Sequence, residues 1–156
     1  MRKTSAKKKI LLPDPRFGNT TVTRFVNNLM FDGKKTTAFR LFYTALDNIS
    51  EKIQDEEALV IFEKALENVM PHVEVRSKRI GGATFQIPHP VREDRRVSLG
   101  MKWMIAAARK RNEKTMDSRL SAELLAAYKE EGTAYKKKQD THRMAEANKA
   151  FSLFRF

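Results

Sequence analysis

The side chains best suited to chemistry in this sequence are cations gathered in one short stretch. Arg76, Lys78 and Arg79 lie close together, and no acid occurs between Val75 and Arg92. Positive charge at this density suits a polyanionic partner. Runs rich in β-branched and aromatic residues at 73–88 flank a Gly-Gly pair that favours a tight hairpin turn. The stretch is therefore predicted to be a basic β-hairpin.

The hairpin alone supports two interpretations. A cationic ribbon can enter a groove of nucleic acid. The same residues also fit an edge hairpin whose charges only keep it in solution. Because two paired strands are marginal in water, the hairpin must lean on helices or on a partner.

The residues that could support catalysis do not form a recognised site. The histidines His72, His89 and His142 are far apart and lack a metal-binding spacing. The glycine pair lacks the context of a nucleotide-binding loop, and the acid pairs at 56–57 and 130–131 fall at expected helix ends. With no cysteine, thiolate metal sites and disulfides are excluded. We expect a binding protein without cofactor, metal or small-molecule substrate, and keep an RNA-modifying enzyme with an unrecognised site as a further hypothesis.

The overall charge supports a polyanionic partner. The 156 residues carry 31 Lys and Arg against 19 Asp and Glu, a formal net charge of +12. The charge inverts between Asp47 and Glu67, where seven acids accompany two lysines, so this segment should face away from a polyanion. No apolar run approaches a membrane span and the basic start lacks the core of a signal peptide, so we expect a cytoplasmic protein without membrane contact.

Apolar spacing predicts the elements that position these charges. The expected fold is mainly α, a single-domain bundle of about six helices with one protruding basic hairpin between the third and the fourth. Within the domain 1–156, we expect a basic flexible arm at 1–12, the hairpin arm at 73–88 and a tail at 151–156. The expected helices cover about 22–31, 37–53, 56–70, 94–111, 116–130 and 133–150.

Local signals predict where two of these helices begin and end. Thr20 or Thr21 should cap the first helix and Asp32-Gly33 should end it. Thr115 should cap the fifth helix and Gly132 should stop it.

Further cations lie outside the hairpin. On the fourth helix they recur about every seven residues, with Gly100, Trp103 and Ala107 interleaved. Small residues allow a backbone to approach closely and an indole can stack on a base, although Trp103 also fits a half-buried core position. The cations of the arm, of the turn after the first helix and of the fourth helix are Arg2, Lys3, Lys7, Lys8, Lys9, Lys34, Lys35, Arg92, Arg95, Arg96, Lys102, Arg109 and Lys110.

The two chain ends and the turn each have a second interpretation. The arm fits a solubilising tail, and the turn lysines fit partners of the preceding helix dipole. The aromatic end at 151–156 should either fold back on the body or mark a protein contact. Since no zinc finger, RNP motif or basic zipper is present, the DNA alternative that we keep is an architectural protein that resembles HU and inserts the hairpin into a minor groove.

Several segments together resemble the small-subunit ribosomal protein seven family of bacteria. The resemblance spans nearly the entire chain and implies a helical body with a hairpin arm, bound to the 3′ major domain of small-subunit ribosomal RNA. The segments, in order, are L-L-P-D-P at 11–15, F-D-G-K-K at 31–35, A-L-E-N-V-M-P at 65–71, V-R-S-K-R-I-G-G-A at 75–83, L-G-M-K-W at 99–103, E-K-T-M at 113–116 and D-T-H-R-M-A-E-A-N-K-A-F at 140–151.

The resemblance also implies partners. Members of the family nucleate assembly of the subunit head, lie near the messenger exit path and the exit-site transfer RNA, and touch platform proteins through the C-terminal helix. Some repress translation of their own operon. Carried over by position, the RNA face comprises the N-terminal cations, the turn lysines, the hairpin cations and the start of the fourth helix. The residues expected to contact protein or transfer RNA are Arg143, Lys149, Phe154, Arg155 and Phe156.

This chain departs from the family at two places, apart from its first ten residues, which differ freely. His89-Pro90 replaces a more usual acidic and apolar pair, and the chain ends in F-R-F rather than tyrosine, arginine, tryptophan. The first departure leaves the binding role unchanged, and the second puts the partner of the tail in doubt.

Overall fold

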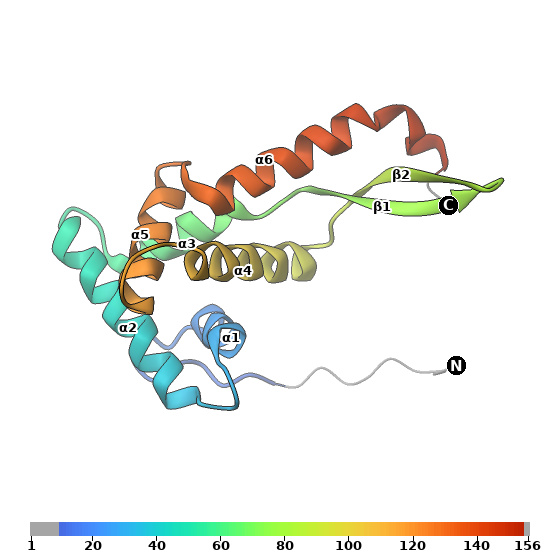
Figure 1. The fold of residues 1–156 in the computed structure, drawn as a ribbon. Coiled ribbons are helices and arrows are strands. Elements are labelled where there is room, and N and C mark those ends of the chain that lie inside the picture. Colours follow the sequence, from blue (N-terminus) through green and yellow to red (C-terminus); the bar gives the residue numbers. More distant parts are fainter. Residues whose placement is uncertain (1–9, 155–156) are drawn as a thin grey trace.

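The computed structural model describes residues 10–154, with side-chain exposure described as far as residue 153. Within that range it contains six α-helices, one hairpin and one short 3-10 helix, which confirms the predicted fold class (Figure 1). The elements are α1 Thr20–Leu29, α2 Lys35–Lys52, α3 Ala58–Val69, β1 Val73–Ile80, β2 Ala83–Pro90, α4 Glu93–Arg109, α5 Met116–Tyr128, α6 Gly132–Ala147 and the 3-10 helix η1 Lys149–Phe154. In the described part of the chain, no helix has the length and apolarity needed to cross a bilayer.

The core forms where the apolar faces of the helices meet. Phe25, Phe42 and Phe62 come from α1, α2 and α3, are fully buried, and have ring centroids 5.1–5.4 Å apart. Edge and tilted contacts of this kind are the favoured geometry of aromatic pairs. Helix α5 packs against α2, α3, α4 and α6 and buries Leu120 and Leu124 completely. The helical body is therefore held together mainly by apolar burial.

Gly100 lies where α4 packs on α3. A Cβ at this position would lie 2.9 Å from Met70 Cγ and 3.3 Å from a Leu66 methyl carbon. Gly100 and Ala107 are both buried. The expectation that these small residues bring RNA close to the α4 backbone is therefore wrong, because they bring another helix close instead.

The start of α1 is capped differently from the prediction. Asn19, rather than Thr20 or Thr21, is the cap, and its side-chain oxygen accepts a hydrogen bond from the Thr21 N–H at 2.7 Å. Asp14 is buried and accepts hydrogen bonds from the backbone N–H groups of residues 16, 17 and 19 and from the Tyr43 hydroxyl. Burial alone would raise the pKa of Asp14, but these hydrogen bonds lower it below its ordinary value.

The ends of α1 and α5 also differ from the prediction. Helix α1 ends at Leu29, before the Asp32-Gly33 pair. Thr115 does cap α5, but its side chain makes no capping hydrogen bond. Helix α5 ends at Tyr128, and Glu130 takes the left-handed position with φ of 60°. Because Glu130 supplies the turn, Gly132 begins α6 instead of stopping α5.

The hairpin is an antiparallel pair in which Ile80 is opposite Ala83. Gly81 and Gly82 have φ values of 55° and 92°, as a two-residue turn of this kind requires. The pair projects beyond the helices, and α6 runs beside it into η1 (Figure 1). The ring centroids of Phe85 on β2 and Phe151 in η1 lie 5.2 Å apart. The hairpin therefore protrudes, but β2 is supported by the C-terminal segment.

Candidate nucleic-acid interface

The three cations of β1 are all exposed, but they do not share one face. Successive side chains of a strand alternate in direction. Arg76 and Lys78 therefore lie on one face, at the register positions opposite Ile87 and Phe85. Arg79 lies on the other face, opposite Thr84. The hairpin thus presents positive charge in two directions.

A buried acid joins the base of the hairpin to α4. The Glu74 carboxylate accepts a hydrogen bond from Arg76 Nε at 2.7 Å and one from Arg95 Nε at 2.8 Å. Its side chain is only 11% exposed, whereas those of the two arginines are more than half exposed. Burial would raise the pKa of Glu74, but the hydrogen bonds from Arg95 and Arg76 lower it below its ordinary value. Glu74 therefore holds two cations side by side while their outer surfaces stay in solvent.

Helix α4 carries this positive charge away from the hairpin. Arg95, Lys102 and Arg109 are seven positions apart and all three are exposed, as expected of residues on one face of a helix. At 1.5 Å per residue, the 17 residues of α4 span about 25 Å. The sevenfold recurrence seen in the sequence thus produces one line of cations.

The line continues into the turn between α1 and α2. Arg109 donates a hydrogen bond from Nη2 to the Leu29 carbonyl at 3.2 Å, and its guanidinium carbon lies 4.0 Å from the centre of the Phe31 ring. The same turn carries Lys34 and Lys35, both exposed. We call the line formed by Arg76, Arg95, Lys102, Arg109, Lys34 and Lys35 the basic ridge.

The other predicted residues of α4 have different environments. Trp103 is half-buried and packs against the core. The Arg96 side chain is 19% exposed and pairs with Glu93 at 2.7 Å. Arg92 and Lys110 are exposed at the two ends of α4. A base would therefore reach Arg92 and Lys110 more readily than the face of Trp103.

The predicted residues of the chain ends are only partly within the described range. Arg143 and Lys149 are exposed on α6 and at the start of η1. Phe154 ends η1, and its side chain is not among those described. Arg2, Lys3, Lys7, Lys8, Lys9, Arg155 and Phe156 lie outside the described residues.

The acidic segment lies at the opposite end of the molecule from the hairpin. The connection between α2 and α3 is at one extreme of the molecule, and the hairpin turn is at the other (Figure 1). Glu51, Asp55, Glu56 and Glu57 are exposed there. The predicted separation of charge is therefore a separation along the long direction of the molecule.

Two of the three histidines meet in the fold. His72 and His142 are distant in sequence but close in the fold. The His72 N–H donates a hydrogen bond to His142 Nε2 at 3.1 Å. Desolvation lowers the pKa of His142, and the nearby Lys138 and His72 lower it further. Among the described residues, no group of three potential ligands could hold a metal ion. The pair is better explained as a contact that docks α6 against the start of β1.

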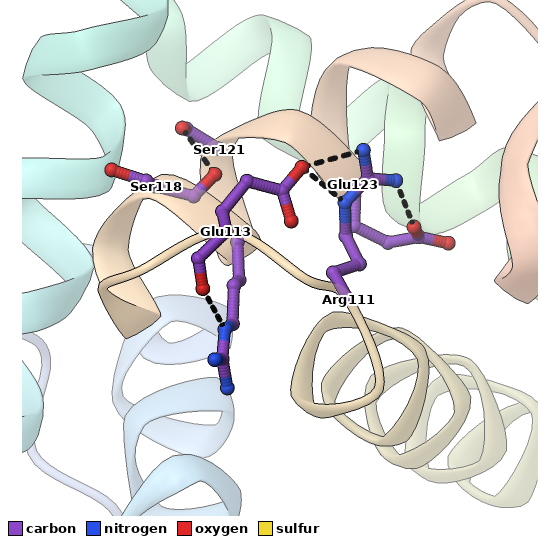
Figure 2. Close-up of polar contacts among 6 residues, drawn as sticks. Arg111, Glu113, Ser118, Ser121 and Glu123 are labelled. Carbon is purple, nitrogen blue, oxygen red and sulfur yellow. Dashed lines mark hydrogen bonds and ion pairs between the residues drawn. The ribbon is translucent and has the colours of Figure 1, made fainter.

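The loop after α4 is fixed by a charge network. Arg111 donates to Glu123 at 2.9 Å and to Glu113 at 2.9 Å, and lies between the two acids in Figure 2. Glu123 is fully buried and also accepts a hydrogen bond from the Ala134 N–H at 2.9 Å. The network thus ties the end of α4 to α5 and to the start of α6. It thereby holds the part of α4 that carries Arg109 and Lys110.

Sequence reasoning missed three residues that shape the interface: Glu74, Phe31 and Glu123. A signal for Glu74 exists, because an acid two positions before Arg76 on a strand shares its face. Phe31 is next to a turn signal but has no periodic partner. Glu123 resembles any polar helix residue, so no local pattern could identify it as buried.

A helical body with an exposed basic hairpin and a basic ridge is typical of the class of nucleic-acid-binding proteins. The family model described as Ribosomal protein S7p/S5e matches residues 1–149 of this chain. The chain belongs to the ribosomal protein S7p/S5e family. Its similarity to a small-subunit ribosomal protein, inferred from sequence segments, is thereby confirmed.

Similar relatives cover the chain from end to end. Small ribosomal subunit protein uS7 of Flavobacterium johnsoniae is 65% identical over 158 residues, with 100% of each chain covered. The proteins of the same name from Flavobacterium psychrophilum and Cytophaga hutchinsonii are 64% and 58% identical, again with 100% of each chain covered. The chain is thus a structural ribosomal protein of the small subunit, located in the cytoplasmic ribosome.

Proposed function

We propose that this protein binds small-subunit ribosomal RNA through its hairpin and basic ridge, and that this binding nucleates assembly of the subunit head. The observation that carries the proposal is the continuity of the ridge from Arg76 on β1, along α4, to Lys34 just before α2. Discrete phosphates along folded RNA can be met by such a line of fixed cations. The family's role is structural, and we accordingly propose a binding function without catalysis or cofactor.

The mode of recognition follows from the shape of RNA. Because the deep groove of double-stranded RNA hides its base edges, a ridge and a hairpin should read the shape of a junction and the positions of its phosphates. Six to ten such contacts would lower the affinity by roughly three to five decades between about 50 and 200 mM salt if RNA followed the range known for duplex DNA. We expect the same direction with a different slope.

The finer roles belong to the same proposal. We propose that the 3′ major domain is the bound region, that messenger RNA and the exit-site transfer RNA lie near the protein, and that α6 and the tail contact neighbouring head and platform proteins or transfer RNA. Repression of the protein's own operon would use the same RNA-binding surface. We also propose that residues 1–156 act as one domain, with 1–12, 73–88 and 151–156 as its arms. The alternative of an architectural DNA-binding protein rests on the hairpin alone, whereas the family supports ribosomal RNA as the partner.

The test compares two RNAs of equal length, a head-domain fragment of small-subunit ribosomal RNA and an unrelated sequence. Filter binding should show clear preference for the first, and equal affinities would overturn the proposal. A competition with duplex DNA addresses the architectural alternative. Co-sedimentation with small subunits through a high-salt gradient provides the independent check.

A matched variant separates binding from folding. Changing Arg76, Lys78 and Arg79 together to alanine should weaken RNA binding severely. The free energy of unfolding should stay within about 1 kcal/mol, since Glu74 keeps its pair with Arg95. A loss of folding would instead make the hairpin part of the structural core.

A further inference from the structure

Phe31 is an apolar residue that is mostly exposed to solvent. Its residue surface is 62% exposed, and it is the one aromatic among the exposed large apolar residues of the described chain. The other described aromatic side chains are buried or half-buried. An exposed phenyl ring costs hydration free energy without stabilising the fold. We therefore expect this ring to have a binding partner.

The position of the ring is well defined. The Lys34 N–H donates to the Phe31 carbonyl at 2.9 Å, which closes a turn whose two central residues have φ of 50° and 74°. On one side, the Arg109 guanidinium carbon lies 4.0 Å from the ring centre. Arg109 is itself fixed by its hydrogen bond to the Leu29 carbonyl. The ring is thus held by a tight turn beneath it and by an arginine against it.

The surroundings of Phe31 identify the class of partner. Lys34 follows the turn, Lys35 follows it with its ammonium 5.6 Å from the Phe39 ring centre, and Lys110 follows Arg109; all three are exposed. Because the turn carries one exposed acid, Asp32, the site is apolar at its centre and net positive at its edge. An apolar protein surface would have to bury these ammonium groups at a cost. An unpaired nucleotide matches both parts, because its base stacks on an aromatic ring while its phosphates meet the cations.

We propose that Phe31 and Arg109 form a stacking platform for one unpaired base of the bound RNA. This inference rests on the proposed function, which it deepens by naming a single-stranded nucleotide as the ligand of this part of the ridge. The ring supplies the stacking surface, and Arg109 positions it and adds a cation–π contact. Lys34 and Lys35 hold the neighbouring phosphates.

The test uses the full-length protein with the head-domain RNA fragment at several salt concentrations. Phe31→Leu keeps an apolar side chain and removes the ring, so the affinity should fall about tenfold, within a range of roughly five- to 100-fold. The salt dependence should stay unchanged, because no phosphate contact is lost. Phe31→Trp should bind within about twofold of the original chain.

Three further variants make the comparison specific. Lys34→Ala should weaken binding and also reduce the salt slope by about one, as loss of a phosphate contact does. Val60→Ala removes an exposed apolar group from the acidic end and should change nothing. Arg109→Lys keeps the charge but loses the planar contact, and should lie between the original chain and Phe31→Leu. Melting temperatures verify that all variants are folded.

The outcomes are distinguishable. Affinity of Phe31→Leu within twofold of the original chain overturns the platform, as does a weak Phe31→Trp. If Phe31→Leu binds RNA normally but no longer co-sediments with small subunits, the ring contacts a protein and the platform is also overturned. If the original chain binds both RNAs equally, the proposed function fails. Photo-crosslinking of a base to the peptide containing Phe31 still decides the platform in that case, and an absent crosslink overturns it.

Discussion

The helical body and the β1–β2 hairpin use charged residues in opposite ways. In the body, Glu123 is fully buried and tied to Arg111 and to the Ala134 N–H, so its charge serves the packing of three elements. In the hairpin, Arg79 projects into solvent on a strand with few buried neighbours. Folding and binding therefore depend on largely different residues. Glu74 is the exception, because it contributes to both.

The separation has a physical reason. Burying a charge requires a partner that compensates its lost hydration, and such partners bring the charge close to neutrality. A charge that binds phosphate must instead remain hydrated until RNA arrives. The fold satisfies both needs by placing neutralised pairs at helix junctions and exposed cations along the ridge, where Arg76 and Arg95 share one acid, Glu74. Substitutions in the body should therefore lower stability more than RNA affinity. Substitutions along the ridge should do the reverse.

The largest effect should come from the apolar core. Leu66→Ala opens a cavity where α3 meets α4 at Gly100 and should lower the free energy of unfolding by about 2–5 kcal/mol. RNA affinity, measured where the protein is still folded, should change less than twofold. Urea unfolding measures the first quantity and filter binding the second. Val60→Ala on the same helix, at a position 47% exposed, is the control and should cost less than about 0.5 kcal/mol.

The next effect tests the buried charge of the body. Glu123→Ala leaves Arg111 with Glu113 alone and the Ala134 N–H without its acceptor, so stability should fall by about 3 kcal/mol. Glu113→Ala should cost much less than Glu123→Ala, because that pair is more exposed. Equal losses in the two variants, measured by thermal unfolding, would contradict the role given to burial.

Glu74→Gln should move the two readouts in opposite directions. Loss of the charge weakens the hydrogen bonds from Arg76 and Arg95, and stability should fall by about 1–2 kcal/mol. RNA binding at low salt should become tighter, because both arginines lose an intramolecular competitor. Weaker RNA binding by a folded Glu74→Gln protein would show instead that the acid holds the arginines in the binding geometry.

The pH dependence of Glu74 has a definite sign. Its pKa in the folded state is lowered from an ordinary value of 4.5. The stabilisation is therefore present above that ordinary value and is lost as the pH falls through the folded-state pKa. Glu74→Gln should remove this part of the acid sensitivity, as followed by unfolding experiments at a series of acidic pH values.

The smallest effect concerns the docking of α6. Because the folded-state pKa of His142 is lowered from 6.5, the protein should be most stable above that value and lose stability as the pH falls below it. Protonation would place a cation beside Lys138 and remove the acceptor used by the His72 N–H. His142→Gln keeps an acceptor that does not titrate and should flatten the stability profile below pH 6.5. An unchanged profile would remove His142 from the explanation.

Local patterns along the chain specify the elements and the sign of their charges. Helical spacing, the Gly81-Gly82 pair and the acids at 47–67 act through neighbours a few positions apart, and such short-range preferences are encoded locally. The six helices and the hairpin were therefore predictable, with errors confined to ends such as Asn19 and Glu130. The segments that resemble the ribosomal family identified it for the same reason, since each is a contiguous string.

The use of these charges depends on contacts between residues that are distant in sequence. Glu74 meets Arg95 across 21 positions and His72 meets His142 across 70, and no local pattern specifies such pairs. Gly100 faces α3 rather than RNA, Trp103 lies against the core, and Phe31 meets Arg109. These outcomes depend on which helix faces come together when the apolar surface is buried. That choice is made by the whole chain at once, because packing joins residues that are distant in sequence.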